Sequence, residues 1–567
     1  MLKACLLIFL LFCTTPALGQ QSKLGKVDFP TSGSPEAQAY FLRGVAALHS
    51  FWFEEALDAF RESTRIEPDF MMGYWGEAMA YNHPLWAQQD TEAGRKTVAK
   101  IKDTPKLTAR ERAYLAAVKA LYGEGDKLTR DRAYSEAMDK VYRAYPDDLE
   151  AACFYSLSLL GTVRPGDKGF RRQMQAGAIA LDVYAKNPDH PGAAHYIIHS
   201  FDDPEHAILA LPAARRYAEI APEAHHARHM PSHIFLQLGM WPEAAASNES
   251  SWAASDAWVK RKGLSITSRD YHSFHWLLYV YTQQGRYGKA EELLSKMQNA
   301  VQESGNDLMM RRNYFNMAAV YLVETRRWDR LSGLFNALGA PAEAQAPAHD
   351  AGDHAVHGGA QMPTDPKAAG TYQARSSFSN IYVTGLADAE SGKESVQKEI
   401  ADLKAMSKQM TDGSDPYRGK IVEIMALEVE AAALAKATRY DDAIGLLKRA
   451  TALEEDLSPP SGPPEIIKPS HELFGEVLLA AGKPKEAGQQ FATALLRQPN
   501  RARSLLGAAR AAAKSGDTAA AAQAYASFQR QWSQADPQSP ELREAHNYLE
   551  QQARARQRER KYPSRCY

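Results

Sequence analysis

A spacing of 34 residues recurs along this chain. His195 and His199 are four residues apart, and the same pair returns 34 residues later as His229 and His233. Near the carboxyl end the same spacing separates two glycines and two alanines: Gly482 and Gly516, Ala487 and Ala521. A period of this length corresponds to a pair of antiparallel helices, a unit that buries its apolar side only by stacking on its neighbours. The period therefore predicts an all-α helical-repeat solenoid, wound as a right-handed superhelix.

Small and aromatic residues recur where the two helices of such a unit touch. In the first unit Gly44 takes position 8, Phe60 takes position 24, and Pro68, which ends the second helix, takes position 32. Clear units follow over 225–258, 271–304, 424–457, 468–501 and 502–535. We expect an N-terminal array over 36–337 and a C-terminal array over 372–536.

The segment between the arrays breaks the pattern. Residues 338–371 are rich in Ala, Gly, Pro and His and show no apolar period, so we predict a flexible loop there. His349, His354 and His357 lie in it, either as a lid over a groove or as part of an unstructured loop. Residues 537–567 read as a basic C-terminal tail, a helix that frays into disorder.

The amino-terminal residues have the pattern of a secretory signal. A lysine at position 3 precedes an apolar run from Ala4 to Phe12, and small residues near Gly19 offer a cleavage site. We predict a signal peptide over 1–19, a polar linker over 20–35, and a periplasmic or extracellular protein. No other apolar stretch approaches the ~18 residues of a membrane-spanning helix, so we expect no stable membrane insertion.

Charge and cysteine content exclude some functions. Lys+Arg 67 against Asp+Glu 68 gives a net charge of −1, so nothing indicates a nucleic-acid partner. Cys5 and Cys13 leave with the signal peptide, and we interpret Cys153 as a buried apolar residue and Cys566 as a free thiol rather than a disulfide pair. The sequence contains no glycine-rich phosphate loop, haem-attachment motif or nucleophile elbow.

Together these patterns resemble the tetratricopeptide repeat (TPR). The segments LHSFWFEEA, YWGEAMAYNHPLW, HYIIHSFDDPEHA, HMPSHIFLQLGMW and YHSFHWLLY further resemble a family of exported bacterial TPR proteins. The run from His225 to Trp276, with ESSW and then HSFHW, is distantly similar to the tetratricopeptide-repeat protein 38 family of eukaryotes. Neither resemblance implies a reaction. The TPR resemblance implies a concave groove, lined by positions 2, 5, 9, 12 and 13 of each first helix, in which peptides bind.

Histidines and aspartates occupy these groove positions. Position 5 is His195, His229 and His275 in three units, and position 9 is His199 and His233 in two. The other groove positions hold His272 at 2, Asp202 at 12, and Asp203, His49 and His83 at 13. His206 follows at the start of the second helix. TPR grooves that clamp a peptide carboxylate carry Lys, Arg and Asn instead, so this groove is not a simple carboxylate clamp.

The leading interpretation is a divalent transition-metal site, with zinc, copper or iron. An i,i+4 histidine pair presents two imidazole nitrogens from one helix face. The predicted ligands are His195, His199, His229, His233, His275 and Asp203, and the supporting groove or second-shell residues are His49, His83, Asp202, His206 and His272. Tyr196 and Met230 stand where a zinc peptidase needs its glutamate, so we do not expect that class of enzyme.

Two other roles for the histidines stay open. They can be hydrogen-bonded packing residues copied with the repeat, or groups that bind an organic ligand or act as acid and base. His225 and His226 follow Pro222, and we expect them to face solvent or cap a helix. The function that fits best is an exported binding or scaffold protein whose groove takes a protein, peptide or small ligand at this histidine-rich, metal-binding site. The alternative is a metal-dependent enzyme built on the repeat array.

Overall fold

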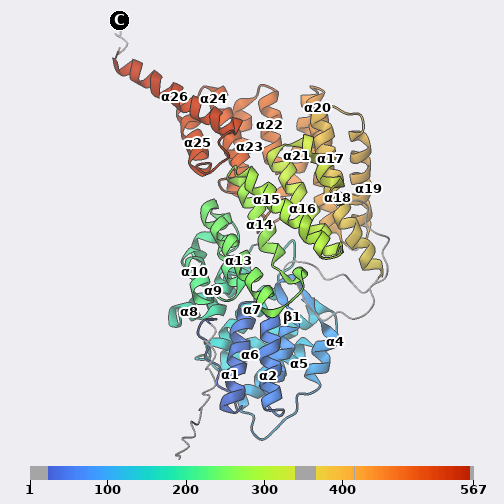
Figure 1. The fold of residues 1–567 in the computed structure, drawn as a ribbon, viewed down its shortest axis with the longest axis vertical. Helices are drawn as coiled ribbons and strands as arrows, with labels where there is room; N and C mark the ends of the chain where they lie inside the picture. The colour runs from blue at the N-terminus through green and yellow to red at the C-terminus, as the bar shows by residue number, and fades with distance from the viewer. Residues whose placement is uncertain (1–22, 168, 339–365, 414, 562–567) are drawn as a thin grey trace, which may run out of the picture.

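The computed structural model describes residues 23–561, apart from residues 168, 339–365 and 414. Within this part of the chain almost every element is a helix packed antiparallel to its neighbour, and the only sheet has two strands of two residues each. Figure 1 shows the first helices in a lower lobe and the C-terminal array in an upper lobe. The predicted all-α solenoid is confirmed.

The lower lobe begins with the first predicted unit, which is α1 and α2. The Phe60 ring of α2 fills the space above Gly44 of α1, where a Cβ atom would lie 2.6 Å from it. The next unit departs from the repeat after α3, because a short antiparallel hairpin pairs Asn82 with Gln89 and His83 with Gln88. The elements here are α1 (Pro35–His49), α2 (Phe53–Ile66), α3 (Met71–Ala80), β1 (Asn82–His83), η1 (Pro84–Trp86), β2 (Gln88–Gln89), α4 (Thr91–Val98), α5 (Ala109–Leu121), α6 (Lys127–Ala144) and α7 (Leu149–Gly161).

The middle of the chain carries the histidines. The predicted unit 271–304 coincides with α14 and α15, and the unit 225–258 with α11 to α13, where Pro231 divides the first helix in two. Gly239 and Gly285 turn the chain between the helices of these units with φ of +64° and +69°, a conformation that favours glycine. The elements are α8 (Arg171–Lys186), α9 (Pro191–Ser200), α10 (Ala207–Ile220), α11 (His225–His229), α12 (Pro231–Gln237), α13 (Trp241–Lys262), η2 (Ile266–Ser268), α14 (Tyr271–Gln283), α15 (Tyr287–Glu303), α16 (Leu308–Thr325), η3 (Trp328–Arg330) and α17 (Leu331–Asn336).

The C-terminal array is more regular. Its three predicted units coincide with the pairs α20–α21, α22–α23 and α24–α25, and the predicted basic tail begins as a further helix, α26. The elements are α18 (Pro366–Ser391), α19 (Val396–Asp412), α20 (Pro416–Lys436), α21 (Tyr440–Glu455), α22 (Ser470–Ala480), α23 (Pro484–Arg497), α24 (Ala502–Ser515), α25 (Thr518–Gln531) and α26 (Pro540–Lys561).

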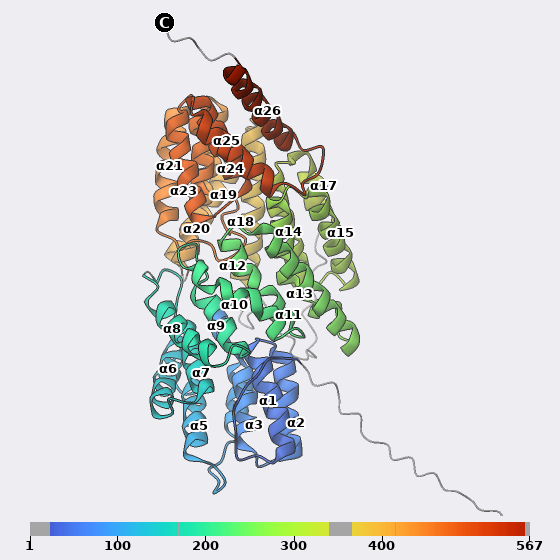
Figure 2. The ribbon, with the colours of Figure 1, turned by 90° about the vertical axis from the view of Figure 1, so that its left-hand side faces the viewer.

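The two arrays are joined by hydrogen bonds between residues far apart in sequence. The Trp241 indole donates to the Asn500 carbonyl at 2.9 Å, and the Trp532 indole donates to the Gln283 carbonyl at 3.0 Å. Figure 2 shows the result, with α14 and α15 beside the C-terminal helices. The turns of the middle units are therefore packed against the C-terminal array rather than against solvent.

The segment expected to be a linker behaves differently. Residues 23–34 form no helix, but Phe29 is fully buried, with its ring centroid 5.2 Å from Phe41 and 4.7 Å from Tyr114. The Asp28 amide also donates to Glu150 at 3.1 Å. This part of the predicted linker is a strap across the first helices, because two of its apolar residues, Leu24 and Phe29, are buried in the core.

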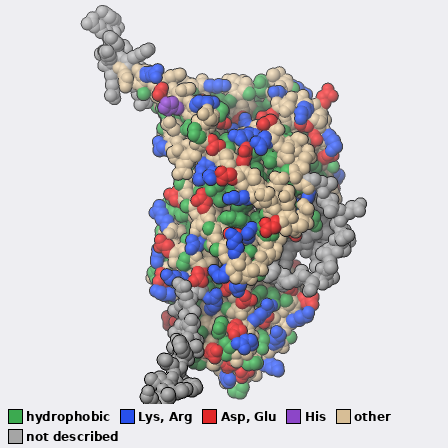
Figure 3. Space-filling view, in the orientation of Figure 1, with side chains coloured by type: hydrophobic (Ala, Val, Ile, Leu, Met, Phe, Trp, Pro, Cys, Tyr) green, Lys and Arg blue, Asp and Glu red, His purple; other side chains and the backbone are tan. Residues whose placement is uncertain are grey.

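Several predictions fall on residues outside the described ranges. These are the signal peptide, most of the loop over 338–371 with its three histidines, and Cys566. Cys153 is fully buried and unpaired, as expected of an apolar residue. Within the described residues, no helix is long and apolar enough to cross a membrane. On the face shown in Figure 3, acidic and basic side chains are interspersed and histidine is nearly absent.

Candidate metal centre

The first histidine pair lies on α9, whose first turn is capped by the side chain of His190. His195 and His199 are one turn apart and project from the same face. The His195 ring is fully buried, 4.3 Å from the centroid of Phe51. Its Nδ1 lies 2.6 Å from the backbone carbonyl oxygen of His49. A carbonyl only accepts, so Nδ1 carries the proton and Nε2 carries a lone pair.

Two other imidazoles point at this lone pair. The Nε2 atom of His199 lies 3.0 Å from His195 Nε2, and the Nε2 atom of His226, on α11, lies 3.2 Å from it. A single lone pair accepts one good hydrogen bond, so two N–H donors at this distance compete for it. Zinc–nitrogen bonds of 2.0–2.1 Å put tetrahedral ligands about 3.3 Å apart, close to the separations seen here. We call His195, His199 and His226 site A.

The second pair lies on α11 and α12. His229 Nδ1 is 2.7 Å from Asn248 Oδ1, and the Asn248 amide nitrogen donates to the Ala244 carbonyl, which fixes the oxygen toward His229. His233 Nδ1 is 2.6 Å from the Asp202 carboxylate. Both Nδ1 atoms are therefore donors, and the neutral rings present two lone pairs to each other with the Nε2 atoms 3.2 Å apart.

His272, from α14, completes this second group. One ligand atom from each of His229, His233 and His272 lies within 4.8 Å of the others, and the same holds for site A. We call these three residues site B. In each site two histidines are buried and one, His199 or His272, is partly exposed.

Burial favours the neutral form of His195, His199, His229 and His272. It lowers the pKa of His195 to about 3 and that of His272 to about 4. The pKa values of His199 and His229 are also held well below the usual 6.5, first by burial and then by neighbouring histidines. Neutral imidazole is the form that binds metal.

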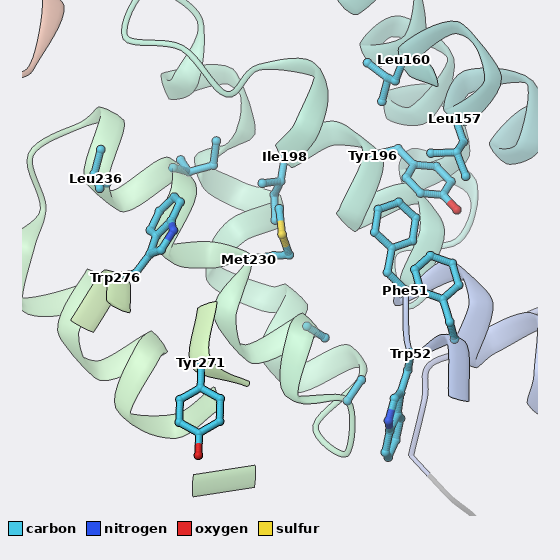
Figure 4. Close-up of a cluster of buried hydrophobic side chains, with 14 of the residues drawn as sticks. Phe51, Trp52, Leu157, Leu160, Tyr196, Ile198, Met230, Leu236, Tyr271 and Trp276 are labelled. Atoms are coloured by element: carbon cyan, nitrogen blue, oxygen red, sulfur yellow. The ribbon is translucent and has the colours of Figure 1, made fainter. Parts of the chain in front are cut away.

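Apolar and aromatic side chains enclose both sites. Figure 4 shows Ile198 and Met230 side by side, with Trp276 and Leu236 on one side of them and Phe51 and Tyr196 on the other. The Trp276 ring lies 4.2 Å from the His233 ring. The connection between α21 and α22 reaches the same place, because the Gln237 amide donates to the Pro460 carbonyl at 2.9 Å.

The sites do not form an open groove as predicted. His195 and His229 have no exposed surface, and His195 is covered by Phe51 from the start of the chain. The hydrogen bonds to His49, Asn248 and Asp202 instead match those by which proteins orient metal-bound imidazoles. Each site offers three nitrogen donors, so a tetrahedral ion would keep a fourth position for water or a ligand.

A third group of potential ligands consists of His49, Glu150 and His190. Glu150 accepts from His49 Nε2 at 2.6 Å and from His190 Nε2 at 3.1 Å. The other ring nitrogens accept in turn, from the Tyr196 hydroxyl at 2.8 Å and the Ala193 amide at 3.2 Å. Each ring nitrogen of His49 and His190 has a protein partner here, and the Cys153 thiol also lies 3.7 Å from His190 Nδ1, so we interpret this group as a structural network.

Other predicted site residues lie outside sites A and B. Asp203 accepts from His206 Nδ1 at 2.9 Å and so pairs with a second predicted residue. His83 stacks on Phe53 with their centroids 3.9 Å apart. His275 faces a separate pocket that Arg312 and Arg418 also line. Of the predicted residues outside sites A and B, only Asp202 makes a side-chain hydrogen bond to a histidine of either site.

The prediction that His225 and His226 face solvent or cap a helix was wrong, because both side chains are buried in the structure and no described side chain caps α11. His225 lies 3.5 Å from the Asp270 carboxylate, and His226 belongs to site A. The available signal was that His226 takes position 2 of its unit, as His272 does in its own.

One segment of the chain matches a known family model. Residues 37–70 match the family model described as the tetratricopeptide repeat. No curated protein matches the chain significantly.

Solved structures with similarity to the chain include the following three. Yeast Tom70 is 10% identical, with 93% of this chain and 91% of that chain covered and a TM-score of 0.27. The TPR domain of P58(IPK) is 13% identical, with coverage of 91% and 99% and a TM-score of 0.19. The human IFIT1 dimer with m7Gppp-AAAA is 14% identical, with coverage of 82% and 91% and a TM-score of 0.30. By its own helix pairs the chain is an all-α helical-repeat protein, and one of its repeats, residues 37–70, matches the tetratricopeptide repeat.

Proposed function

We propose that this TPR protein is an exported scaffold that binds a divalent transition metal at its buried histidines. One observation carries the proposal. The Nε2 atoms of His229 and His233 face each other at 3.2 Å, while both Nδ1 protons are committed to oxygen acceptors.

Facing lone pairs need a cation between them. A proton between them would make one ring an imidazolium, and burial acts against that form of His229 by holding its pKa well below 6.5. A metal ion satisfies both lone pairs and leaves the hydrogen bonds to Asn248 and Asp202 in place. This supports a metal as the partner of the pair at neutral pH.

The donor set narrows the choice of metal. Sites A and B consist of imidazoles alone, which suit zinc, copper, iron and nickel better than magnesium or calcium. Export is part of the proposal on the strength of the signal-like residues 1–19 alone. The scaffold role rests on the helix pairs, whose stacking creates extended surfaces for protein partners.

Metal content of the mature protein, purified without an affinity tag, tests the proposal. We expect near-stoichiometric zinc, copper or iron in the parent, and none in a variant with His195, His199, His229 and His233 changed to Ala. A matched variant with His83, His206, His275 and His546 changed to Ala should keep its metal. The far-UV circular dichroism of all three should remain helical. An absence of metal in the parent, even after incubation with zinc, copper or iron, would overturn the proposal.

A second candidate function is a metal-dependent enzyme. The observation that favours it is the count of three histidines in each site, since catalytic zinc sites have three protein ligands and an open position. Azide added to the cobalt-loaded protein tests this, because it binds at an open position and changes the visible spectrum. An unchanged spectrum would contradict the enzyme, and the scaffold would remain as the proposed function.

A further inference from the structure

Sites A and B are the same arrangement in consecutive repeat units. Taking the units as 191–224, 225–258 and 271–304, site A consists of positions 5 and 9 of the first and position 2 of the second. Site B consists of positions 5 and 9 of the second and position 2 of the third. The residues in that order are His195, His199 and His226, then His229, His233 and His272.

The short helix α11 makes this duplication possible. It lies between α9 and α14 in the stack and supplies one histidine to each site. His226 reaches back to His195, while His229, one turn later, faces His233 and lies 4.7 Å from the His272 ring. One helix therefore serves two neighbouring sites without sharing a ligand atom between them.

Each site also has its own oriented hydrogen bonds. Site A holds His195 through the His49 carbonyl, and site B holds His229 and His233 through Asn248 and Asp202. Rings of different sites are farther apart than the bonded rings within a site. The centroids are 5.9 Å apart for His199 and His233, but 4.7 Å for His195 and His199. Among the described residues, the groups of mutually close ligand atoms at sites A and B contain three histidines each and no further ligand.

We infer that the chain binds two divalent transition-metal ions, one at site A and one at site B. This inference rests on the proposed metal-binding function and adds the number of ions and the assignment of His226 and His272 as ligands. The series ends after two, because the third unit has His275 at position 5 but Tyr279 at position 9. His275 accordingly lies in neither group.

Titration of the metal-free full-length protein with Co²⁺, followed by the visible absorption of bound cobalt, tests the inference. We expect the parent to bind two equivalents. His226→Ala, which disrupts site A, and His272→Ala, which disrupts site B, should each bind one. A variant in which His195, His226, His229 and His272 are all changed to Ala should bind none. His206→Ala, which alters a histidine paired with Asp203, should retain two. Conservative His226→Gln and His272→Gln variants repeat the test if an alanine variant loses helical structure.

The outcomes separate the two proposals. One equivalent in the parent, retained in both single variants, would show one ion shared by the four histidines of the two i,i+4 pairs and would overturn the inference. Loss of both equivalents from either single variant would overturn the independence of the sites. No cobalt bound by the parent would instead overturn the metal-binding function itself.

Discussion

Two buried polar clusters in this protein are built on opposite principles. Where the arrays meet, the Arg501 guanidinium lies 2.8 Å from the carboxylates of both Glu472 and Glu324, so opposite charges neutralise each other. In the middle units, His229 and His233 present identical lone pairs to each other at 3.2 Å. The first cluster is complete as a set of protein groups, whereas we propose that a metal ion completes the second.

The comparison teaches how to distinguish a structural network from a ligand site. Burial alone would raise the pKa of Glu472, but Arg501 and Lys468 together hold it well below its ordinary value. For His229, burial and the neighbouring histidines act in the same direction, against the charged form. Counting which protons have acceptors is therefore more informative than counting polar residues.

The largest expected effect is at the complete cluster. Arg501→Met leaves Glu324 buried without this cation and Glu472 with Lys468 alone, and we expect a loss of about 3–5 kcal/mol in the free energy of unfolding. Urea unfolding, followed by circular dichroism, measures it. Arg449→Met, which removes an exposed ion pair to Glu423, should cost under about 1 kcal/mol. Equal losses in the two variants would contradict the contrast.

Metal removal should act only on the incomplete cluster. For each ion removed, chelation lowers the free energy of unfolding by about 2.7 kcal/mol relative to protein held at a free metal concentration 100 times its Kd. The variant lacking His195, His199, His229 and His233 should show no change on chelation. Thermal unfolding with and without chelator measures the difference. An equal response in that variant would place the stabilising ion elsewhere.

A smaller effect is expected from the residues that orient the imidazoles. Asp202→Ala removes the acceptor of His233 Nδ1, and we expect the affinity for Co²⁺ to fall about 10- to 100-fold. Asp203→Ala is the matched control, because Asp203 pairs with His206 instead. Competition with a chromophoric chelator gives both affinities. Similar losses in the two variants would mean that the local turn, rather than the hydrogen bond, determines affinity.

The smallest effect is a pH dependence of the C-terminal array. Glu428 accepts from the Tyr382 and Ser470 hydroxyls, each at 2.6 Å, and burial raises its pKa to about 8. In the folded state Glu428 keeps a proton that it releases in the unfolded state above its ordinary pKa. Its contribution to the free energy of unfolding is therefore fully present below about pH 4.5 and is lost as pH rises through 8. Between pH 6 and 7 we expect a loss of about 1.4 kcal/mol.

Glu428→Gln should remove this slope, since the amide does not titrate. The opposite sign applies to His275, whose pKa burial lowers to about 4. Its contribution is present above the unfolded pKa of about 6.5 and is lost as pH falls toward 4. Urea unfolding at a series of pH values tests both directions. A slope that persists in the Glu428→Gln variant would assign it to another group.

The repeat period alone predicted much of the architecture. Pairs such as α22–α23 and α24–α25 fall where 468–501 and 502–535 were drawn, because each unit repeats the same small and aromatic contacts. The period also placed His195 with His199 and His229 with His233 on common faces. It failed at residues 82–89, where a hairpin replaces the regular connection, and at Phe29, which packs into the core from an apparent linker.

The sequence by itself determined which residues share a helix face, since that follows from 3.6 residues per turn and the 34-residue repeat. Only the tertiary structure decided that His226 and His272 join the pairs and that Asp203 does not. It also decided the tautomers, through the His49 carbonyl, Asn248 and Asp202. The physical reason is that a ligand set and a proton's position depend on contacts between separate helices, and periodicity within one helix does not specify them.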